Sequence, residues 1–235
     1  MRVAIMQPYF FPYIGYFQLI SAVDKFIIYD NIQYTKKGWI NRNRMLQNGK
    51  DVMFSLPLKK DSDYLDVVER EISSDFKRVK LLNQIKGAYH RAPYFAQVFP
   101  LIKEIVENED NNLFRYLQSS IMKACEYMGI ETEIVVSSDI KVNHELKNQD
   151  KVIALCEAVD ADIYVNAIGG KELYSQEDFR DKGINLKFIQ SKSLEYHQFD
   201  KEFVPWLSII DVMMFNSIDV TKECLNTGFE LVEGE

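Results

Sequence analysis

The chain has 235 residues and a formal net charge of −7, with 47% hydrophobic and 27% charged residues. This length and composition are those of an ordinary globular protein, and they favour a single α/β domain over residues 1–235. The acidic charge repels phosphate backbones, so it argues against DNA or general nucleic-acid binding. An anionic ligand therefore has to be met by a local group of cationic side chains.

Three widely spaced cysteines, Cys125, Cys156 and Cys224, lie in apolar stretches. Their odd number and spacing predict buried thiols rather than a disulfide framework, and we predict no metal site. The apolar run at the N-terminus is too short for a signal peptide, and no stretch reaches the ~20 apolar residues that a membrane helix needs. We therefore expect a cytoplasmic protein without membrane insertion, and we leave open whether it forms homo-oligomers.

A strand–turn–helix–strand pattern opens the chain. Residues 2–6 form a short apolar run that Pro8 ends, a helix is expected to begin near Pro12, and residues 25–29 form the next strand. A right-handed crossover makes these strands parallel. The pattern predicts a Rossmann-like, mostly parallel sheet flanked by helices, in which ligands sit beyond the carboxyl ends of the strands.

The remaining segments extend this α/β pattern. Helical periodicity predicts a helical insertion in the middle third, over residues 75–129, whose last helix Asn111 or Asn112 caps and Gly129 ends. A hairpin is expected from strands at 51–58 and 66–72. Further elements are expected as strands at 133–136, 163–166 and 184–189, and as helices at 150–159 and 205–226.

The first candidate site is the turn after the opening strand, which contains Gln7, Tyr9, Tyr13, Gly15 and Tyr16. Gly15 allows close approach to a helix N-terminus, where unpaired N–H groups attract an anion, and the tyrosines offer stacking faces. The turn resembles the His-x-Gly-His turn of nucleotidylyltransferases and class I synthetases, with tyrosine in place of both histidines. Neutral tyrosine cannot replace an imidazolium. The structural alternative is an aromatic turn that only packs.

The second candidate site follows the second strand and is rich in cationic and amide side chains. Its predicted members are Asp30, Asn31, Gln33, Lys36, Lys37, Trp39, Asn41 and Arg42, with Arg44 beside them. Arg42 or Arg44 could bind a phosphate through two hydrogen bonds, Lys36 or Lys37 could act as a point charge, and Trp39 could stack on a base or sugar. The structural alternative is a solvated basic loop.

A third candidate is the glycine pair Gly169-Gly170 followed by Lys171, which comes directly after an expected strand. Backbone N–H groups beside a lysine at a strand end suit an anionic ligand. It is not a Walker motif, because both the glycine spacing of that motif and the Ser or Thr after its lysine are missing. A simple structural turn is the alternative.

The fourth candidate segment contains His197, the best acid–base candidate among the three histidines. His90 and His144 have less polar company in the sequence. Downstream, Ser208 is expected to cap a helix whose first turn contains Asp211. We predict His197 or Asp30 as the group that accepts a proton during catalysis.

Together these segments resemble the WbqC-like protein family over essentially the whole chain. The resemblance is carried by Gln7-Pro-Tyr-Phe-Phe-Pro-Tyr-Ile-Gly-Tyr-Phe-Gln-Leu-Ile, Trp39-Ile-Asn-Arg-Asn, Gly169-Gly-Lys, Tyr196-His-Gln and Leu207-Ser-Ile-Ile-Asp. Ser217 departs from the pattern, which has glycine after Phe215-Asn216. The resemblance implies a role in O-antigen and other surface-polysaccharide assembly, around nucleotide-linked sugars.

Three functions are compatible with these features. The first is acyl or aminoacyl transfer to the amine of a nucleotide-linked amino sugar, with ATP and Mg²⁺, an acyl carrier protein or aminoacyl-tRNA supplying the group. The second is nucleotidylyl transfer to a sugar phosphate, and the third is non-catalytic binding of a nucleotide sugar. We expect the first.

Overall fold

The computed structural model describes residues 1–199 and 202–234. Its main sheet has the strand order β5-β2-β1-β6-β7-β8, in which the first five strands are parallel and β8 runs antiparallel to β7. The strands are β1 (Arg2–Met6), β2 (Lys25–Ile28), β5 (Glu133–Val136), β6 (Ile163–Ala167), β7 (Asn185–Ser191) and β8 (Phe229–Glu233). This order, read as 3-2-1-4-5-6, is that of a Rossmann-type sheet. The predicted fold class is therefore confirmed.

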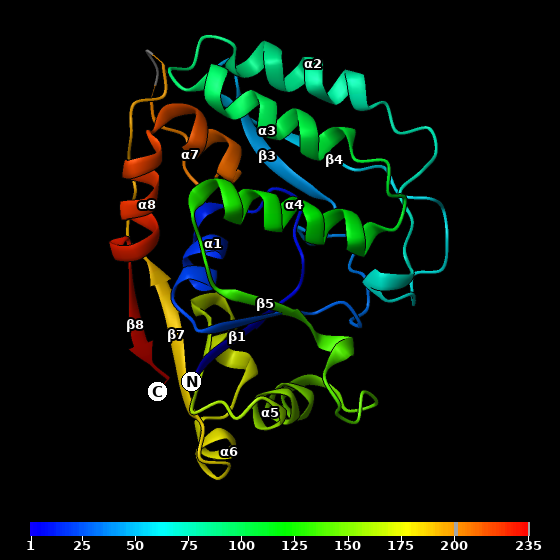
Figure 1. Cartoon of the computed structure of the whole chain (residues 1–235), viewed down its shortest axis with the longest axis vertical. Helices are drawn as coiled ribbons and strands as arrows, with labels where there is room; N and C mark the ends of the chain where they lie inside the picture. The colour runs from blue at the N-terminus through cyan, green and yellow to red at the C-terminus, as the bar shows by residue number, and fades with distance from the viewer. Residues whose placement is uncertain (200–201, 235) are drawn as a thin grey trace.

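Helices cover both faces of this sheet, as Figure 1 shows. On one face lie α5 (Asn148–Ala158) and α6 (Gln176–Arg180), which share a core with Val3, Ile27 and Tyr164. On the other face lie α1 (Ile14–Ser21) and α8 (Ile218–Thr227). Strand residues such as Ala4 and Phe26 belong to the core on that face. The alternation of buried residues along β1 thus joins two separate helical layers.

The predicted helical insertion forms α2 (Arg78–Tyr89), α3 (Phe95–Glu107) and α4 (Leu113–Met128). Asn112 caps α4 by accepting from the Arg115 N–H, and Gly129 ends it with a left-handed φ of 69°. These two signals were readable in the sequence because each satisfies backbone groups that a helix end leaves unpaired. The insertion shares one continuous core with the face of the sheet that α1 covers.

The expected hairpin of residues 51–58 with 66–72 is wrong in its pairing, although a strand does form at residues 50–55. Leu58 and Ile72 form only one isolated antiparallel bridge. Strands β3 (Arg42–Gln47) and β4 (Lys50–Ser55) pair through the turn residues Asn48 and Gly49, which have φ of 54° and 77°. An Asn-Gly pair is the strongest short hairpin signal. The strand before it was not predicted, because its first residues, Arg42 to Arg44, were assigned to a binding segment. Residues 66–72 form isolated bridges and the 3-10 helix η1 (Val67–Glu69) instead.

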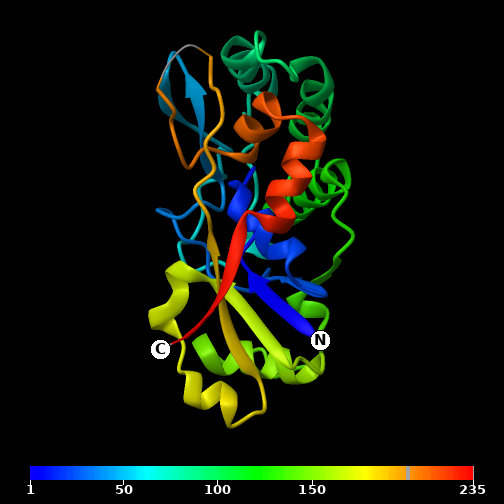
Figure 2. The same ribbon diagram turned by 90° about the vertical axis from the view of Figure 1, so that its left-hand side faces the viewer.

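Residues 205–226, which were expected to form a single helix, also differ from the prediction. This part of the chain forms α7 (Ile209–Phe215) and α8, and the side chain of Ser217 caps α8 by accepting from the Val220 N–H. Serine at this position therefore begins a helix. The edge strand β8 was not predicted, and Figure 2 shows it beside β7. The other 3-10 helices are η2 (Ser137–Asp139) and η3 (Ile168–Leu173).

Candidate functional site

The fold fixes where a ligand is expected. In a sheet of this order the strand order reverses between β1 and β6, and ligands bind outside the carboxyl ends of the strands at such a switch point. The ladder between these strands pairs only Arg2 with Ile163 and Val3 with Tyr164, whereas the β1–β2 ladder continues to Met6. The carboxyl halves of β1 and β6 therefore do not pair with each other. Gln7 comes directly after β1, and Ile168 comes directly after β6.

The turn that follows β1 is strained and tightly held. Phe11 has a φ of 43°, a conformation that bulky residues rarely adopt. The buried Asn43 amide donates to the carbonyl oxygens of Phe10 at 3.1 Å and Phe11 at 2.8 Å. Pro12 accepts from the Ile209 N–H at 2.8 Å. Strand β3 and the start of α7 therefore fix the path of the chain into Tyr13 and α1.

An aromatic and cationic surface forms where these segments meet, and we call it the aromatic cluster. Its members are Tyr13, Trp39, Arg42, Arg44 and Trp206. The Arg44 guanidinium carbon lies 5.4 Å from the centre of the Trp39 ring, and Arg42 lies 6.0 Å from it. The rings of Tyr13 and Trp206 are 6.1 Å apart. Residues from three distant segments thus form one surface.

Both tryptophans of the chain belong to this cluster, and both are exposed to solvent. Trp39 exposes 39% of its surface and Trp206 exposes 64%. Trp206 also has a φ of 60°, which costs a non-glycine residue of its size about 1–3 kcal/mol. An exposed, strained tryptophan contributes little to the core, and such strain is concentrated at ligand sites. No role was predicted for Trp206 from the sequence, because residue type alone does not show that it is exposed and strained.

Arg44 connects the two tryptophans. Its Nη2 donates to the Trp206 carbonyl oxygen at 3.2 Å, and its Nη1 forms an ion pair with Asp51 at 3.0 Å. Its Nε is buried without a hydrogen-bond partner among the described residues. The Arg44 carbonyl accepts from the Ser208 N–H at 2.9 Å, which ties β3 to the segment that carries Trp206.

The predicted residues of the opening turn divide into half-buried and buried groups. Tyr13 is half-buried at the first turn of α1, and burial raises its pKa. Tyr16 is buried, and its hydroxyl donates to the Gln7 carbonyl oxygen at 3.0 Å. Tyr9 packs against Tyr16 with ring centres 5.5 Å apart. A side chain at Gly15 would collide with the Tyr13 ring, so this glycine gives Tyr13 its place. Only Tyr13 of this group reaches the aromatic cluster.

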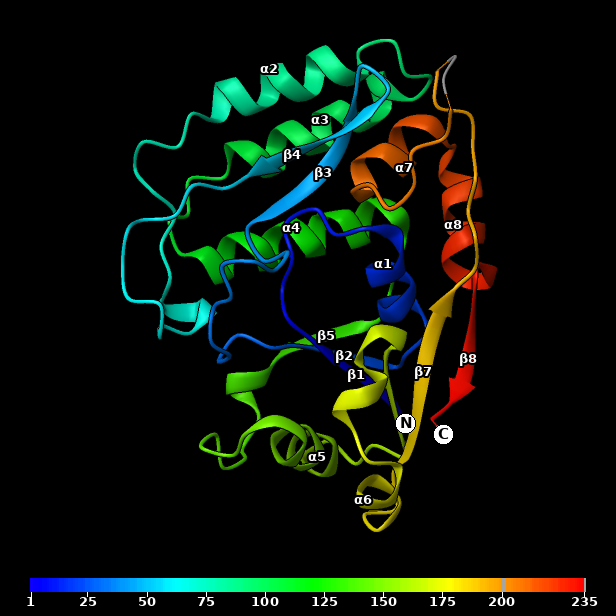
Figure 3. The same cartoon turned by 180° about the vertical axis from the view of Figure 1, so that it is seen from behind.

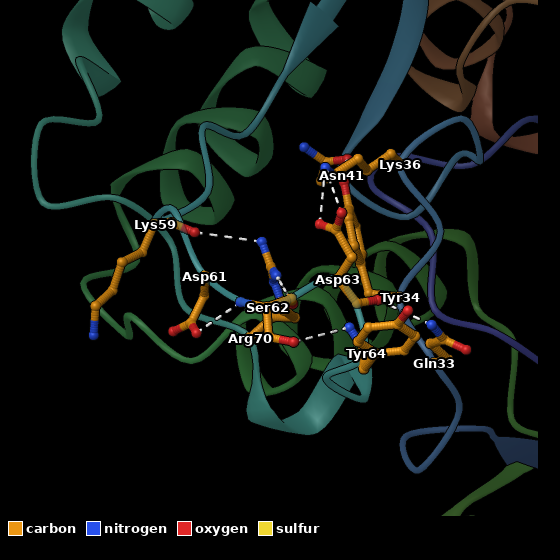
Figure 4. A network of polar contacts seen from close by, with 10 residues as sticks. All are labelled: Gln33, Tyr34, Lys36, Asn41, Lys59, Asp61, Ser62, Asp63, Tyr64 and Arg70. Atoms are coloured by element: carbon orange, nitrogen blue, oxygen red, sulfur yellow. Dashed lines mark hydrogen bonds and ion pairs between the residues drawn. The ribbon is translucent and has the colours of Figure 1, made fainter.

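Most polar groups of the predicted basic segment bind other parts of the same loop region. Gln33 donates to the Asp63 carbonyl at 2.9 Å, and Lys36 pairs with the Asp63 carboxylate at 2.8 Å, as Figure 4 shows. Asn41 accepts from the Tyr34 hydroxyl at 2.8 Å and donates to a backbone carbonyl. These contacts fasten residues 33–41 to residues 56–63. Lys37 is exposed.

Arg42 is also occupied in part. Its Nε donates to the Gly38 carbonyl at 2.9 Å and its Nη2 donates to the Lys37 carbonyl at 2.6 Å. If Arg42 binds a phosphate through two hydrogen bonds, as predicted, it has to use the guanidinium N–H donors that these two contacts leave. The buried Arg70, which was not predicted, binds the Ser62 and Lys59 carbonyls and lies 4.9 Å above the Tyr34 ring. A sequence pattern gives no sign of such a contact.

Asp30 and Asn31 lie at the carboxyl end of β2 in a second polar group. The buried Asp30 carboxylate accepts from the Ser137 hydroxyl at 2.7 Å and from the Ser138 N–H at 3.0 Å. The Asn31 side chain contacts the Ser137 oxygen at 2.8 Å and His144 Nδ1 at 3.0 Å. His144 therefore has more polar company than its sequence neighbours indicated. This group joins the ends of β2 and β5.

The glycine pair after β6 lies in η3, and the side chain of Ser175 caps the following α6. A side chain at Gly170 would come within 2.6 Å of the buried Asn166 amide, whereas Gly169 faces open space. Lys171 is partly exposed. This segment borders the switch point.

His197 is exposed, and the residues on either side of it have a structural role. The buried Asp211 carboxylate accepts from the Tyr196 hydroxyl at 2.7 Å, the Gln198 amide at 2.6 Å and the Tyr89 hydroxyl at 2.9 Å. Burial raises the pKa of Asp211 to about 6, although these hydrogen bonds lower it. As expected, Ser208 caps α7 and Asp211 lies in its first turn.

A concavity of about 770 Å³ lies along α4 and the segment that follows it, and Met122, Glu126 and Ile130 are among its lining residues. None of the residues predicted for the site lines it. Within residues 1–199 and 202–234, no group of three or more His, Cys, Asp or Glu side chains could hold a metal ion. In the same part of the chain, no helix is both long and apolar enough to cross a bilayer.

The sheet order and the crossovers define a Rossmann-type α/β protein. Comparison with known proteins makes the assignment more specific. The chain belongs to the WbqC-like protein family, whose model matches residues 7–223. It is 28% identical over 221 residues to the uncharacterized protein Rv1507c of Mycobacterium tuberculosis (strain ATCC 25618 / H37Rv), and the match covers 92% of this chain and 93% of that protein. No solved structure matches.

Proposed function

We propose that this protein is an enzyme of surface-polysaccharide assembly that transfers an acyl or aminoacyl group to the amine of a nucleotide-linked amino sugar. The observation that supports this most is the aromatic cluster. Two exposed tryptophans can stack on a base or sugar ring, and the arginines between them can meet a phosphate in an otherwise acidic protein. The link of the family with O-antigen assembly agrees with such a ligand.

The position of the cluster also supports a nucleotide-linked ligand. Tyr13 stands at the start of α1, whose N-terminus follows the strand at the switch point. First-turn N–H groups there favour an anion, and the cluster extends outward from this point. A diphosphate at the helix and a ring on Trp206 would use both features.

The proposed reaction forms an amide bond between the sugar nitrogen and the acyl carbon. The bond from that carbon to the carrier breaks, its electron pair leaves with the carrier sulfur or oxygen, and the amine loses one proton. His197 and Asp30 remain the predicted proton acceptors. Asp30 already accepts two hydrogen bonds in a buried position, which leaves the exposed His197 as the more accessible of the two.

The buried Tyr16 argues against the second function, nucleotidylyl transfer. Tyr16 takes the place of the second histidine of the His-x-Gly-His turn, and its hydroxyl is bound to the Gln7 carbonyl. It therefore offers no group to a phosphate, in addition to lacking the charge of an imidazolium.

Mass spectrometry of reaction mixtures tests the proposal. The protein is incubated with nucleotide-linked amino sugars and with acyl carrier protein, aminoacyl-tRNA, or ATP and Mg²⁺ with a free acid as donor. We expect a product in which the acyl group replaces one amine hydrogen. Release of pyrophosphate from a nucleoside triphosphate in the presence of a sugar phosphate would establish nucleotidylyl transfer instead. Ligand binding without turnover of any of these substrates would favour a non-catalytic protein.

A further inference from the structure

A buried lysine lies next to the Asp30 group at the carboxyl edge of the sheet. Lys151, in the first turn of α5, exposes only 4% of its surface. Its Nζ donates to the Asn31 carbonyl at 3.2 Å and lies 5.0 Å from the centre of the Tyr29 ring. Lys151 is not among the predicted site residues, and it has no role in the proposed reaction.

The ammonium group of Lys151 is incompletely paired. It has three N–H donors, and one carbonyl oxygen accepts from them within the described part of the chain. The neighbouring carboxylate of Asp30 is bound to Ser137 and Ser138, and no described carboxylate forms an ion pair with Lys151. A buried charge without an ionic partner is costly, so a protein that retains one commonly uses it.

The charged and polar groups around Lys151 indicate which kind of ligand group its remaining N–H donors could bind. Burial lowers the pKa of Lys151, and Lys147 lowers it further, while Asp66 and Asp30 act in the opposite direction. Burial and the neighbouring Glu69 raise the pKa of Asp66. The side chains of Asn31 and Ser137 are hydrogen-bonded to each other, and Asn31 is also bound to His144. The free donors of Lys151 are thus the local groups that need an acceptor oxygen.

We propose that Lys151 binds a carboxylate or phosphate group of a second substrate at the carboxyl ends of β2 and β5. The identity of that substrate as the acyl donor rests on the proposed function, whereas the existence of the anion site does not. A free carboxylate points to an acid that is activated here, and a phosphate points to ATP or another phosphorylated donor. Figure 3 shows α5 and its start on the opposite face of the sheet from α1.

Thermal shift with sodium pyrophosphate and sodium acetate tests this site, with sodium chloride to match ionic strength. We expect one of the two anions to raise the Tm of the wild-type protein, because a ligand that binds only the native state stabilises it. Lys151→Met should remove that rise. Methionine fills a similar volume without a charge, so this variant should fold with an unchanged or higher ligand-free Tm.

Two further variants make the result specific. Lys147→Met, which removes an exposed lysine from the same helix end, should keep most of the anion response. Asp66→Asn should strengthen anion binding severalfold, because it removes a nearby negative charge. No response to either anion, or an equal response in the wild type and Lys151→Met, would overturn the proposal. Nucleotide-sugar binding at the aromatic cluster could persist in that case, so the two failures are distinguishable.

Discussion

Asp211 is a carboxylate that the protein buries completely, and it organises the segment leading to Trp206. It binds Tyr196 and Gln198, and Gln198 in turn holds both backbone groups of Val204 at 2.7 and 3.1 Å. In the segment Tyr196-His197-Gln198 the first and third residues thus hold one buried acid. The same carboxylate should give the folded protein a measurable pH dependence.

The folded-state pKa of Asp211, about 6, lies above its ordinary value of 3.8, so the folded state binds more protons between these values. Stability from this group is present below about pH 4 and falls as pH rises toward 6, by about 2 kcal/mol between pH 4.5 and 7. Urea unfolding measures the free energy of unfolding of the wild type and of Asp211→Asn. The wild-type value minus the variant value should be about 2 kcal/mol more positive at pH 4.5 than at pH 7. A constant difference would contradict the assignment.

At the scale of elements, the hairpin β3–β4 serves as a support for the turn after β1. Asn43 carries two buried hydrogen bonds from β3 to that turn, and Arg44 carries the link to Trp206. The segment Trp39-Ile-Asn-Arg-Asn therefore has a partly structural role. Its polar residues look like ligand-binding groups in the sequence because residue type alone does not reveal a backbone partner.

Removing the Asn43 amide should loosen this fastening. Asn43→Ala leaves two buried carbonyl groups without their donor, which should lower the free energy of unfolding by about 1–3 kcal/mol. Differential scanning calorimetry would show a Tm several degrees lower, whereas the exposed Asn185→Ala should change it little. An unchanged Tm in Asn43→Ala would mean that the turn holds its strained Phe11 conformation by other contacts.

For the molecule as a whole, much of the fold could be predicted from the sequence, because hydrophobic periodicity and cap residues are local signals. The parallel strands, the helical insertion and the caps at Asn112, Gly129 and Ser208 follow from such signals. The hairpin at Asn48-Gly49 was not predicted, although its turn residues are a local signal, because the strand before it was taken as part of a binding segment. The edge strand β8 was missed because its register depends on β7.

The candidate site was predictable only in part, since it depends on contacts between distant segments. Tyr13, Trp39 and Arg42 were predicted from residue type and position after strands, and the fold places them in the aromatic cluster. Trp206 and Lys151 were missed, because only the folded chain brings the first to Arg44 and the second to Asn31. Many predicted polar residues instead hold their own loop, and sequence spacing cannot separate these two roles.

The central claim is that the aromatic cluster binds a nucleotide-linked sugar, and isothermal titration calorimetry of wild type, Trp206→Ala and Tyr64→Ala tests it most directly. Tyr64 is also an exposed aromatic residue, but it lies outside the cluster. Loss of stacking on Trp206 should cost about 1–3 kcal/mol, which raises Kd by roughly 5- to 160-fold, while Tyr64→Ala should bind as the wild type does. Equal affinities in all three proteins, or no binding of any nucleotide sugar by the wild type, would contradict the account.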